Sequence, residues 1–437
     1  MAVAISSLMS QLTIQSARSL QGEITLPGDK SISHRAILFG AISEGITRVS
    51  NCLKAEDVDS TRKAIQALGV SVEVRGDERV VHGKGIAALK SPSAPIDCGN
   101  SGTTTRLLLG LLSGLPIAAT LTGDASLSKR PMRRVTEPLE KMGAKFHGPN
   151  GPDRLPLTVQ GGSLKGITYT LPIPSAQLKS AILLAGLSAQ GPTTVIEPVE
   201  SRDHTERMLS YFGTRVKRNG LSITIEPGAQ LKGRQVSVPG DISSAAFFLV
   251  GAAIVPGSSI VARRIGLNPT RTGLIDLLKR MGANIWITSV SGEDWEPTGD
   301  VTMKSSRLHG ENILDHEIPR LIDELPILMV AATQAEGKTV IQGAGELRVK
   351  ETDRIHSMVT GLSAMGAKIY AEGDSVVIDG PTSLRGAQLQ SFGDHRTAMA
   401  LAIAGLVADG PTEIEGAEWI GISFPEFPQL LRSLIRA

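Results

Sequence analysis

The residues best suited to chemistry are cations and hydroxyls gathered where apolar stretches begin. In one such cluster, Gly28 is expected to permit a tight turn, and Lys30, Ser31 and Arg35 follow it. A helix N-terminus presents unpaired N–H groups and the positive end of the helix dipole, both of which favour anions. Lys30 adds a mobile cation, and Arg35 adds a planar fork that binds phosphate or carboxylate through two hydrogen bonds. The cluster therefore predicts an anion site at a helix start.

The same residue types recur at other predicted helix starts. These further clusters are Asn100 to Arg106, Ser175 to Lys179 and Gly393 to Arg396. Serine and aspartate at such positions often only cap a helix. The repetition of lysine, arginine and Gly-Thr donors at equivalent positions nevertheless favours a shared anion site. Two cationic strings, residues 128–134 and 348–354, supply further arginines, for which solvated surface charge is the alternative interpretation.

Carboxylates able to transfer protons occur in two places. Asp323 and Glu324 come directly before an apolar helix, where at least one of them is well placed for proton transfer. Lys350, Glu351 and Arg354 occupy positions i, i+1 and i+4 at the predicted start of an amphipathic helix. We therefore expect Lys350 and Arg354 to share a helix face. Glu351 is expected either to cap the helix or to act as an acid or base.

Nucleotide and metal chemistry find no support in the motifs. No Gly-x-x-x-x-Gly-Lys-Ser/Thr loop or Gly-x-Gly-x-x-Gly fingerprint opens a unit. The histidines lack metal-ligand spacing, and we expect His34, His204 and His395 to form hydrogen bonds instead. Cys52 and Cys98 are too few for a disulfide framework, and we expect buried, inert thiols. The sequence therefore predicts neither a metal nor a cofactor.

A sixfold repeat explains why these clusters resemble one another. In each copy, a short polar cluster leads into an Ala-, Leu- and Gly-rich apolar helix that closes with glycine. The predicted helices are Ser31 to Gly45, Ser101 to Gly114, Ser175 to Gly191, Ile242 to Gly257, Asp323 to Gly337 and Asp394 to Gly410. Each has almost no polar face, so other elements must surround it. Six α/β units therefore imply interior helices with sheets outside them, most economically as three units in each of two domains.

A second, amphipathic helix recurs between the apolar ones and ends at a glycine before a β-rich stretch. The first runs from Thr61 to Leu68 and ends at Gly69. Equivalent glycines, each suited to a left-handed helix terminus, are Gly143, Gly213, Gly282 and Gly366. A sixth such helix is expected at Phe424 to Ile435. A single large α/β layer fold would explain the alternation, but it would not explain the close match among the apolar helices.

Composition narrows the class of protein. The chain has 437 residues, of which 41% are hydrophobic, so it can bury more than one core. A net charge of only +2 and an aromatic content of 3% argue against a nucleic-acid surface. The N-terminus does not resemble a secretory signal, and the apolar runs are too short to span a bilayer. We expect a cytoplasmic monomer that binds small molecules and contacts neither nucleic acid nor membrane.

Taken together, these segments resemble the motif set of the 5-enolpyruvylshikimate-3-phosphate synthase family. The segments are Leu26 to Arg35, Asn100 to Arg106, Arg130-Pro131, Ser175 to Gln177, Lys350 to Arg354 and Gly393 to Arg396. Residues 201–207 and 240–246 are most similar to the bacterial class II group. The resemblance covers nearly the whole chain. It implies an α/β fold with two similar domains, each of three βαβαββ repeats arranged as an inside-out α/β barrel.

The resemblance also implies domain limits and an activity. The middle domain would span residues 26–239, and the second domain would combine residues 1–25 with 240–437, joined by two crossings with the active site between the domains. The enolpyruvyl (carboxyvinyl) group of phosphoenolpyruvate would pass to the 5-hydroxyl of shikimate 3-phosphate through a tetrahedral intermediate, releasing phosphate. This reaction lies in the shikimate pathway toward chorismate and aromatic amino acids.

Site residues follow from the same resemblance. The catalytic residues would be Lys30, Asp323 and Glu351. Shikimate 3-phosphate would contact Lys30, Ser31, Arg35, Ser175, Ala176, Gln177, Ser201, Asp323 and Lys350. Phosphoenolpyruvate would contact Lys30, Asn100, Gly102, Arg130, Gln177, Arg354 and Arg396. The inhibitor glyphosate is expected to compete with phosphoenolpyruvate beside Gly102, where the missing Cβ leaves space.

One departure from the family pattern and three alternatives bear on this interpretation. Many relatives carry a lysine just before a C-terminal Ser/Thr-Phe-Pro, whereas Gly421 and Ile422 stand there in this chain.

UDP-N-acetylglucosamine enolpyruvyl transferase uses a loop cysteine, and neither Cys52 nor Cys98 has that context. An RNA-processing repeat protein would show exposed aromatics or a basic surface. A phosphate-binding module without catalysis would not need the paired carboxylates.

Overall fold

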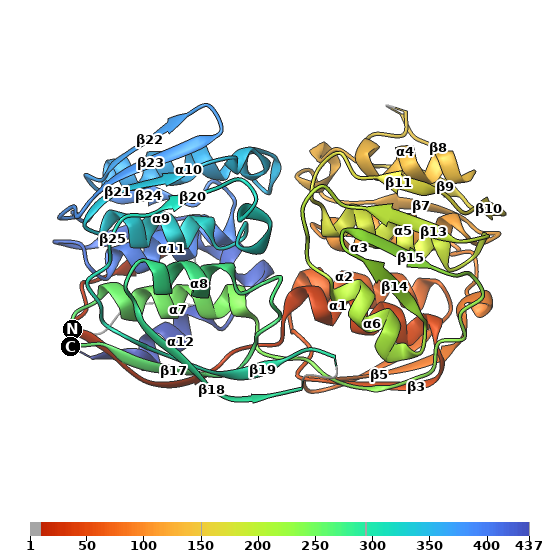
Figure 1. Ribbon diagram of the computed structural model, residues 1–437, viewed down its shortest axis with the longest axis horizontal. Coiled ribbons are helices and arrows are strands. Elements are labelled where there is room, and N and C mark those ends of the chain that lie inside the picture. Colours follow the sequence, from red (N-terminus) through yellow and green to blue (C-terminus); the bar gives the residue numbers. More distant parts are fainter. Residues whose placement is uncertain (1–9, 150, 293–294, 437) are drawn as a thin grey trace. The chain divides into compact units, whose positions relative to one another are not determined.

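The computed structural model describes residues 10–149, 151–292 and 295–436. The chain forms two compact units (Figure 1). The continuous unit is Gly28–Val238, and the discontinuous unit combines Met1–Pro27 with Pro239–Ala437. The chain therefore passes from one unit to the other twice, once near Gly28 and once near Val238.

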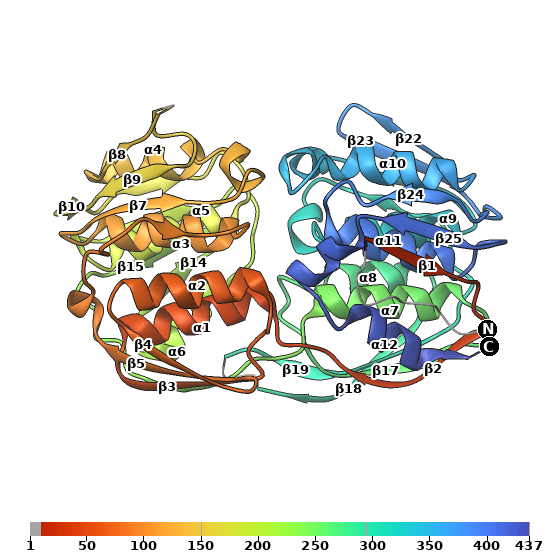
Figure 2. The same cartoon turned by 180° about the vertical axis from the view of Figure 1, so that it is seen from behind.

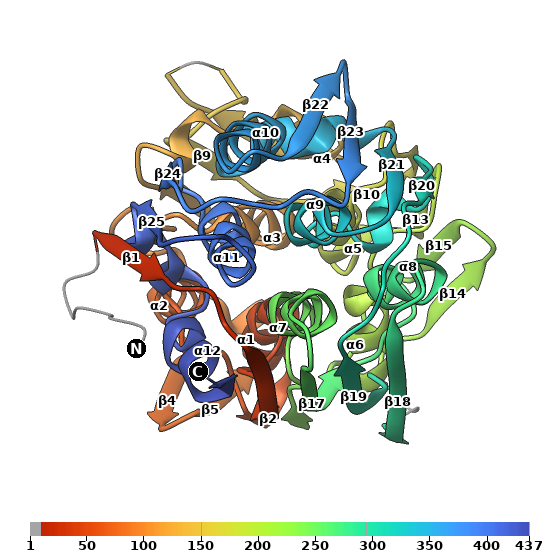
Figure 3. The same cartoon turned by 90° about the vertical axis from the view of Figure 1, so that its left-hand side faces the viewer.

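The predicted apolar helices are confirmed, with ends that differ from the prediction by a few residues. In the continuous unit they are α1 (Lys30–Ile42), α3 (Gly102–Ser113) and α5 (Ala176–Gly186). In the discontinuous unit they are α7 (Ile242–Ile254), α9 (Leu325–Thr333) and α11 (His395–Gly405). Every residue of α9 and α11 is buried, as expected for a helix without a polar face. Figure 3 shows α7, α9 and α11 inside the discontinuous unit, with strands around them.

Sheets of similar plan recur in the continuous unit. They have the strand orders β16-β3-β5-β4, β6-β7-β9-β8 and β11-β13-β15-β14. The strands are β3 (Glu44–Ser50), β4 (Ser71–Arg75), β5 (Glu78–Lys84), β6 (Ile96–Asp97), β7 (Ala118–Thr122), β8 (Lys145–His147), β9 (Leu157–Gln160), β11 (Thr168–Thr170), β13 (Thr193–Ile196), β14 (Val216–Asn219), β15 (Ser222–Ile225) and β16 (Gln235–Ser237). In each sheet the first pair is parallel and the others are antiparallel. Since β16 pairs with β3, the last strand of the unit closes onto its first sheet.

The discontinuous unit has sheets of related plan, but they contain five, four and three strands, and two of them include an N-terminal strand. Its sheets have the orders β18-β19-β17-β2-β26, β20-β21-β23-β22 and β1-β25-β24. The strands are β1 (Gln11–Ile14), β2 (Ser19–Thr25), β17 (Ser259–Gly266), β18 (Asn284–Ser291), β19 (Thr298–Lys304), β20 (Asn312–Ile313), β21 (Gly337–Ile341), β22 (Lys368–Glu372), β23 (Ser375–Gly380), β24 (Gln388–Gln390), β25 (Thr412–Glu415) and β26 (Ile435–Arg436). Glu23 of β2 lies opposite Val261 of β17, and Leu12 of β1 lies opposite Ile414 of β25. Backbone hydrogen bonding therefore assigns the N-terminal segment to this unit.

The predicted amphipathic helices are also present. They are α2 (Glu56–Ala67), α4 (Arg133–Met142), α6 (His204–Phe212), α8 (Gly273–Arg280), α10 (Arg354–Ala364) and α12 (Phe427–Leu434). The glycines predicted to end the first five have φ angles from 86° to 116°, which confirms the left-handed termini. Figure 2 shows α2 beside α1, on one face of the sheet that contains β3, β4 and β5.

Two local predictions are wrong. Lys350 and Glu351 do not lie in a helix with Arg354, because α10 begins only at Arg354. The Asp353 carboxylate accepts a hydrogen bond from the His356 N–H at 2.9 Å, and this cap fixes the helix start after both residues. They therefore lie in the turn that follows the 3₁₀ segment Ala344–Val349.

Gly28 is not required for a tight turn, since its φ is not among the positive values. A Cβ at Gly28 would lie 1.9 Å from the Asn51 carbonyl oxygen and 2.9 Å from Val238 Cγ1. Close backbone approach within the continuous unit therefore explains the glycine.

Candidate functional site

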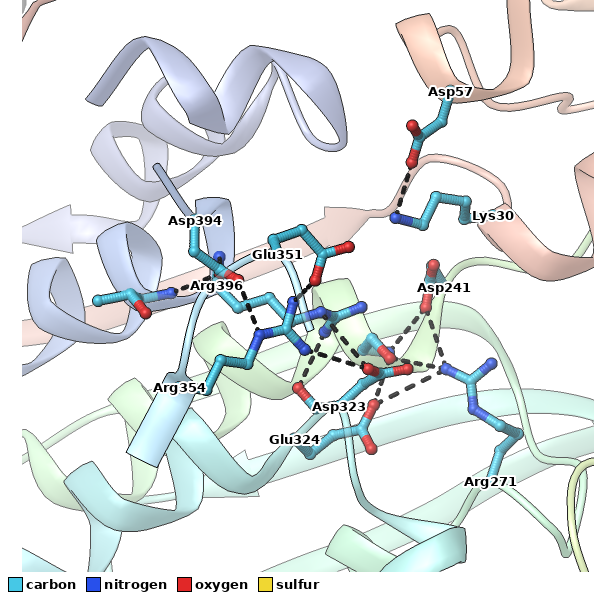
Figure 4. A network of polar contacts seen from close by, with 12 residues as sticks. Lys30, Asp57, Asp241, Arg271, Asp323, Glu324, Glu351, Arg354, Asp394 and Arg396 are labelled. Carbon is cyan, nitrogen blue, oxygen red and sulfur yellow. Dashed lines mark hydrogen bonds and ion pairs between the residues drawn. The ribbon is translucent and has the colours of Figure 1, made fainter. Parts of the chain in front are cut away.

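The start of α1 combines a cap with a paired lysine. The Asp29 carboxylate, which is buried, accepts a hydrogen bond from the Ile32 N–H at 2.9 Å and caps the helix. Lys30 Nζ lies 3.1 Å from Asp57 Oδ2 on α2 (Figure 4). The predicted mobile cation is thus held by a carboxylate that the sequence motifs did not single out, while its side chain keeps partial exposure.

Arg35 is a buried link between helices. Its Nε donates to Thr205 Oγ1 at 2.7 Å, and its Nη2 donates to Ser180 Oγ at 2.9 Å. Its Nη1 donates to the Ser31 carbonyl at 3.0 Å. The guanidinium therefore ties α1 to α5 and α6, and it fixes the backbone of the predicted ligand Ser31.

The start of α3 lies against arginines. Arg130 Nη2 donates to Asn100 Oδ1 at 2.9 Å, and Asn100 Nδ2 donates to Asp124 Oδ2 at 2.7 Å. A Cβ at Gly102 would lie 2.8 Å from Arg106 Nη1 and 3.3 Å from Arg130 Nη1. The glycine therefore leaves just enough room for two cationic groups beside a helix N-terminus, where an anion is favoured.

Gln177 joins the start of α5 to the start of α3. Its Oε1 accepts a hydrogen bond from Arg106 Nη1 at 2.7 Å, and its Nε2 donates to Thr103 Oγ1 at 3.0 Å. Ser175 caps α5 by accepting from the Leu178 N–H, and Ala176 is the first residue of the helix. Gln177 therefore links the start of α5 to the start of α3 by two hydrogen bonds within the continuous unit.

Arg354 gathers three carboxylates in the discontinuous unit (Figure 4). Its side chain is 1% exposed. Its Nε donates to Asp394 Oδ2 at 2.8 Å, its Nη2 to Glu351 Oε2 at 2.7 Å, and its Nη1 to Asp323 Oδ1 at 3.3 Å. Burial alone would lower the pKa of Arg354, but the three carboxylates raise it above its usual value. Burial likewise opposes ionisation of Asp394, yet Arg354 lowers the pKa of that carboxyl.

Arg396 completes this cluster from the first turn of α11. Its Nη1 donates to the Asp323 carbonyl at 3.0 Å, and its backbone N–H donates to Asp394 Oδ1 at 2.7 Å. Predicted cations and predicted proton carriers are thus brought together, with one more carboxylate than guanidinium. Lys350 lies in the turn beside Glu351 and is partly exposed.

The adjacent carboxylates before α9 have different surroundings. Asp323 faces Arg354 and keeps 16% side-chain exposure. Glu324 is fully buried, accepts a hydrogen bond from the Ser243 hydroxyl, and lies 3.7 Å from Arg271 Nη2. Arg271 Nη2 also donates to Ser243 Oγ at 2.7 Å. Of this pair, only Asp323 has a side chain that reaches the surface of its unit.

Arg271 and the carboxylates around Lys179 are not predicted from the sequence. Arg271 lies outside every predicted cluster, so no local signal identifies it. Lys179 belongs to a predicted cluster, but its Nζ is fully buried between Glu197 and Glu206, at 2.9 and 2.7 Å. A lysine in an otherwise apolar helix was the available signal, because such a charge needs a buried partner.

Both cysteines are buried as predicted, and of the three histidines predicted to form hydrogen bonds, His34 has one that the structure shows directly. Cys52 and Cys98 are buried, and burial raises the pKa of each thiol to about 11. His34 Nδ1 lies 2.6 Å from Thr61 Oγ1, in a hydrogen bond between α1 and α2. Over the residues described, no group of three or more His, Cys, Asp or Glu side chains could hold a metal ion. Within the same ranges, no helix is both long and apolar enough to cross a membrane.

Comparisons with known proteins match nearly the whole chain to a single family. The family model "EPSP synthase (3-phosphoshikimate 1-carboxyvinyltransferase)" matches residues 14–431. The chain is 51% identical over 421 residues to a 3-phosphoshikimate 1-carboxyvinyltransferase of Bacillus cytotoxicus, covering 96% of this chain and 99% of that protein. A Brevibacillus brevis protein of the same name is 50% identical over 420 residues, with the same two coverages. A solved EPSP synthase from Acinetobacter baumannii superposes with a TM-score of 0.87 and 46% identity, covering 97% of this chain and 98% of that one.

Proposed function

The chain belongs to the EPSP synthase family, and we propose that it transfers the carboxyvinyl group of phosphoenolpyruvate to the 5-hydroxyl of shikimate 3-phosphate, with release of phosphate. One observation carries this proposal. The family match runs from residue 14 to residue 431, so it includes every helix start at which anion or proton chemistry was predicted. The reaction places the protein in the shikimate pathway.

We further propose that the two compact units are the predicted domains, and that residues of both units serve each substrate. Shikimate 3-phosphate is assigned to Lys30, Ser31, Arg35, Ser175, Ala176, Gln177, Ser201, Asp323 and Lys350. Phosphoenolpyruvate is assigned to Lys30, Asn100, Gly102, Arg130, Gln177, Arg354 and Arg396. The hydrogen bonds from Arg130 to Asn100 and from Arg106 to Gln177 support grouping the members from the continuous unit.

The reaction is an addition followed by an elimination, and each step delivers one proton and removes another. In the addition, the phosphoenolpyruvate methylene gains a proton while the substrate hydroxyl attacks the adjacent carbon and loses its own proton, which forms a tetrahedral intermediate. In the elimination, the methyl group loses a proton, the double bond is restored, and the bond to the phosphate oxygen breaks as that oxygen takes up a proton. We assign these transfers to Lys30, Asp323 and Glu351. The 16% and 21% side-chain exposures of Asp323 and Glu351 support this assignment, whereas Asp394 and Glu324 are fully buried.

Arg354 and Arg396 are suited to stabilising charge on the departing phosphate. Both guanidiniums are held by fixed partners around Asp323, so they need little reorganisation during the reaction. The departure at Ile422 removes a lysine that many relatives carry, so these arginines would carry more of that task.

The related activity on UDP-N-acetylglucosamine is disfavoured by both cysteines. A loop cysteine that takes part in chemistry needs an accessible thiol of ordinary or lowered pKa. Cys52 and Cys98 are 2% and 0% exposed, and burial raises the pKa of each to about 11.

Finer features are also proposed. Glyphosate is an anion with a phosphonate and a carboxylate, and we assign it to the phosphoenolpyruvate residues around Gly102. The two neighbouring guanidiniums support this assignment. We also infer that the protein is cytoplasmic and that it is a monomer. Light scattering coupled to size-exclusion chromatography would test the monomeric state.

Phosphate release tests the proposed function. The protein is incubated with phosphoenolpyruvate and either shikimate 3-phosphate, UDP-N-acetylglucosamine or no acceptor. We expect rapid phosphate release with shikimate 3-phosphate alone. Equal release without an acceptor would indicate a phosphatase, and release with the nucleotide sugar would indicate the related transferase.

A further inference from the structure

Lys179 of α5 is a fully buried cation. Its side chain is 0% exposed, and Nζ lies 2.9 Å from Glu197 Oε2 and 2.7 Å from Glu206 Oε1. Nζ also donates to the Ser201 carbonyl at 3.3 Å. Lysine is seldom buried in this way, because desolvation of an ammonium costs several kcal/mol, on the order of the attraction that repays it.

These contacts hold Ser201 on several sides. Glu197 Oε1 accepts hydrogen bonds from the Ser201 backbone N–H, at 3.1 Å, and from the Ser201 hydroxyl. Since Lys179 binds both Glu197 and the Ser201 carbonyl, the N–H, hydroxyl and carbonyl of Ser201 all connect to one buried ion cluster. Burial raises the pKa of Glu206, and the ammonium of Lys179 opposes that rise.

The cluster also fixes Ser201 relative to the start of α5. Lys179 is one turn beyond the cap residue Ser175, and its N–H donates to the Ser175 carbonyl at 3.0 Å. Ser201 follows β13, and Glu206 lies on α6. Three elements are thus joined at a single Nζ atom.

Stability alone does not explain such a cluster. Replacement of a buried ion pair by apolar groups is often neutral or stabilising, whereas a fixed arrangement of polar groups needs directional partners. Ser175, Gln177 and Ser201 are among the residues assigned to shikimate 3-phosphate. Lys179 connects the start of α5, where the first two lie, with the turn that carries the third.

We propose that Lys179 and Glu197 are positioning residues for shikimate 3-phosphate, which hold Ser201 at a fixed place relative to the start of α5 without contacting the substrate. This inference rests on the proposed function. The Ser201 hydroxyl donates to Glu197 in the free protein, and a phosphate oxygen is a strong enough acceptor to take over that hydrogen bond. The backbone N–H of Ser201 stays bound to Glu197 meanwhile.

The test measures binding of shikimate 3-phosphate to the full chain by calorimetry, together with steady-state kinetics. Lys179→Met and Glu197→Gln should each raise the Kd for shikimate 3-phosphate at least about tenfold, the equivalent of one lost charge-assisted hydrogen bond. The KM for phosphoenolpyruvate and kcat at saturating shikimate 3-phosphate should change less than about twofold, since the remaining ligands are untouched.

Lys217→Met is the matched control. Lys217 Nζ lies 2.9 Å from Glu226 Oε1 in the same unit, but the two side chains are 52% and 47% exposed. Its Kd for shikimate 3-phosphate should equal that of the unsubstituted protein. If Lys179→Met does not fold, Glu197→Gln decides the test. The ammonium of Lys179 faces two carboxylates, so it keeps Glu206 as a partner when Glu197 loses its charge, and we expect this variant to fold.

A double variant separates positioning from a merely structural role. If Glu197 acts through Ser201, the Kd of Ser201→Ala/Glu197→Gln should exceed that of Ser201→Ala by less than about twofold. If the two substitutions instead raise the Kd for shikimate 3-phosphate by factors that multiply in the double variant, the proposal is wrong. A lowered melting temperature with an unchanged Kd for shikimate 3-phosphate in Glu197→Gln would also overturn it. Failure of the unsubstituted protein to use shikimate 3-phosphate would instead refute the proposed function.

Discussion

Two capping aspartates in the discontinuous unit differ mainly in burial, and comparing them measures the strength of the Arg354 cluster. Asp394 accepts from the N–H groups of Arg396 and Thr397 at 2.7 and 3.1 Å, and it binds Arg354 with its other oxygen. Asp353 caps α10 and lies 3.0 Å from Arg348 Nη1. An asparagine at either position keeps an acceptor for the cap but loses the carboxylate charge.

The expected loss of unfolding free energy differs between the two variants because Asp394 is buried and Asp353 is partly exposed. Asp394 and Arg354 are 0% and 1% exposed, and removal of one partner from a buried pair costs about 3–5 kcal/mol. Arg354 retains Glu351 and Asp323, so we expect about 3 kcal/mol for Asp394→Asn. The Asp353 and Arg348 side chains are 34% and 35% exposed, and solvent screening limits the loss for Asp353→Asn to about 1 kcal/mol or less.

Thermal and denaturant unfolding of both variants provide the assay. A loss of about 3 kcal/mol should lower the Tm of a domain of this size by roughly 6–12 °C, and the control should fall by no more than about 4 °C. Asp394→Asn should also raise the KM for phosphoenolpyruvate, since Arg354 is assigned to that substrate. Equal losses of stability in the two variants would refute the claim that burial makes this cluster strong.

Three further outcomes are expected. Asp323→Asn and Glu351→Gln should each lower kcat by about 10²- to 10⁴-fold with a much smaller change in substrate affinity, measured by steady-state kinetics and calorimetry; near-normal kcat in both would remove them from proton transfer. Burial lowers the pKa of His34 from 6.5 to about 3, so the unfolded chain takes up a proton at this residue before the folded protein does, and stability is lost as pH falls through that window. The free energy of unfolding relative to His34→Asn should therefore drop by about 1 kcal/mol between about pH 6 and about pH 5, and an unchanged difference would contradict a lowered pKa for His34. Gly102→Ala should weaken competitive inhibition by glyphosate more than phosphoenolpyruvate binding, because a Cβ there meets Arg106 and Arg130; unchanged sensitivity at several phosphoenolpyruvate concentrations would overturn the placement.

The repeats and their helices could be predicted because their signals are local. A fully apolar helix must be buried, and a glycine after an amphipathic helix ends it in the left-handed region. Both rules act within a few residues, and the burial of α9 and the φ angle of 92° at Gly366 follow them.

Partners across the fold could not be predicted in this way. Lys179 and Glu197 are 18 residues apart, which is too far for them to be neighbours on one helix. They are in contact because the chain that leaves α5 comes back beside it in β13. Asp323 and Glu324 are adjacent residues of similar chemistry just before α9, yet Asp323 faces Arg354 and Glu324 faces Arg271. The sequence pattern predicts a helix that already includes Lys350, but α10 begins at Arg354 because Asp353 caps it there.

The position of an isotopic label tests carboxyvinyl transfer most directly. The protein is given shikimate 3-phosphate and phosphoenolpyruvate that carries heavy oxygen at the bridge between carbon and phosphorus. Transfer of the carbon fragment breaks the carbon–oxygen bond, so all of the label should appear in the released phosphate, detected by mass spectrometry. Hydrolysis at phosphorus breaks the other bond, and label recovered in pyruvate with unlabelled phosphate would contradict the assigned reaction.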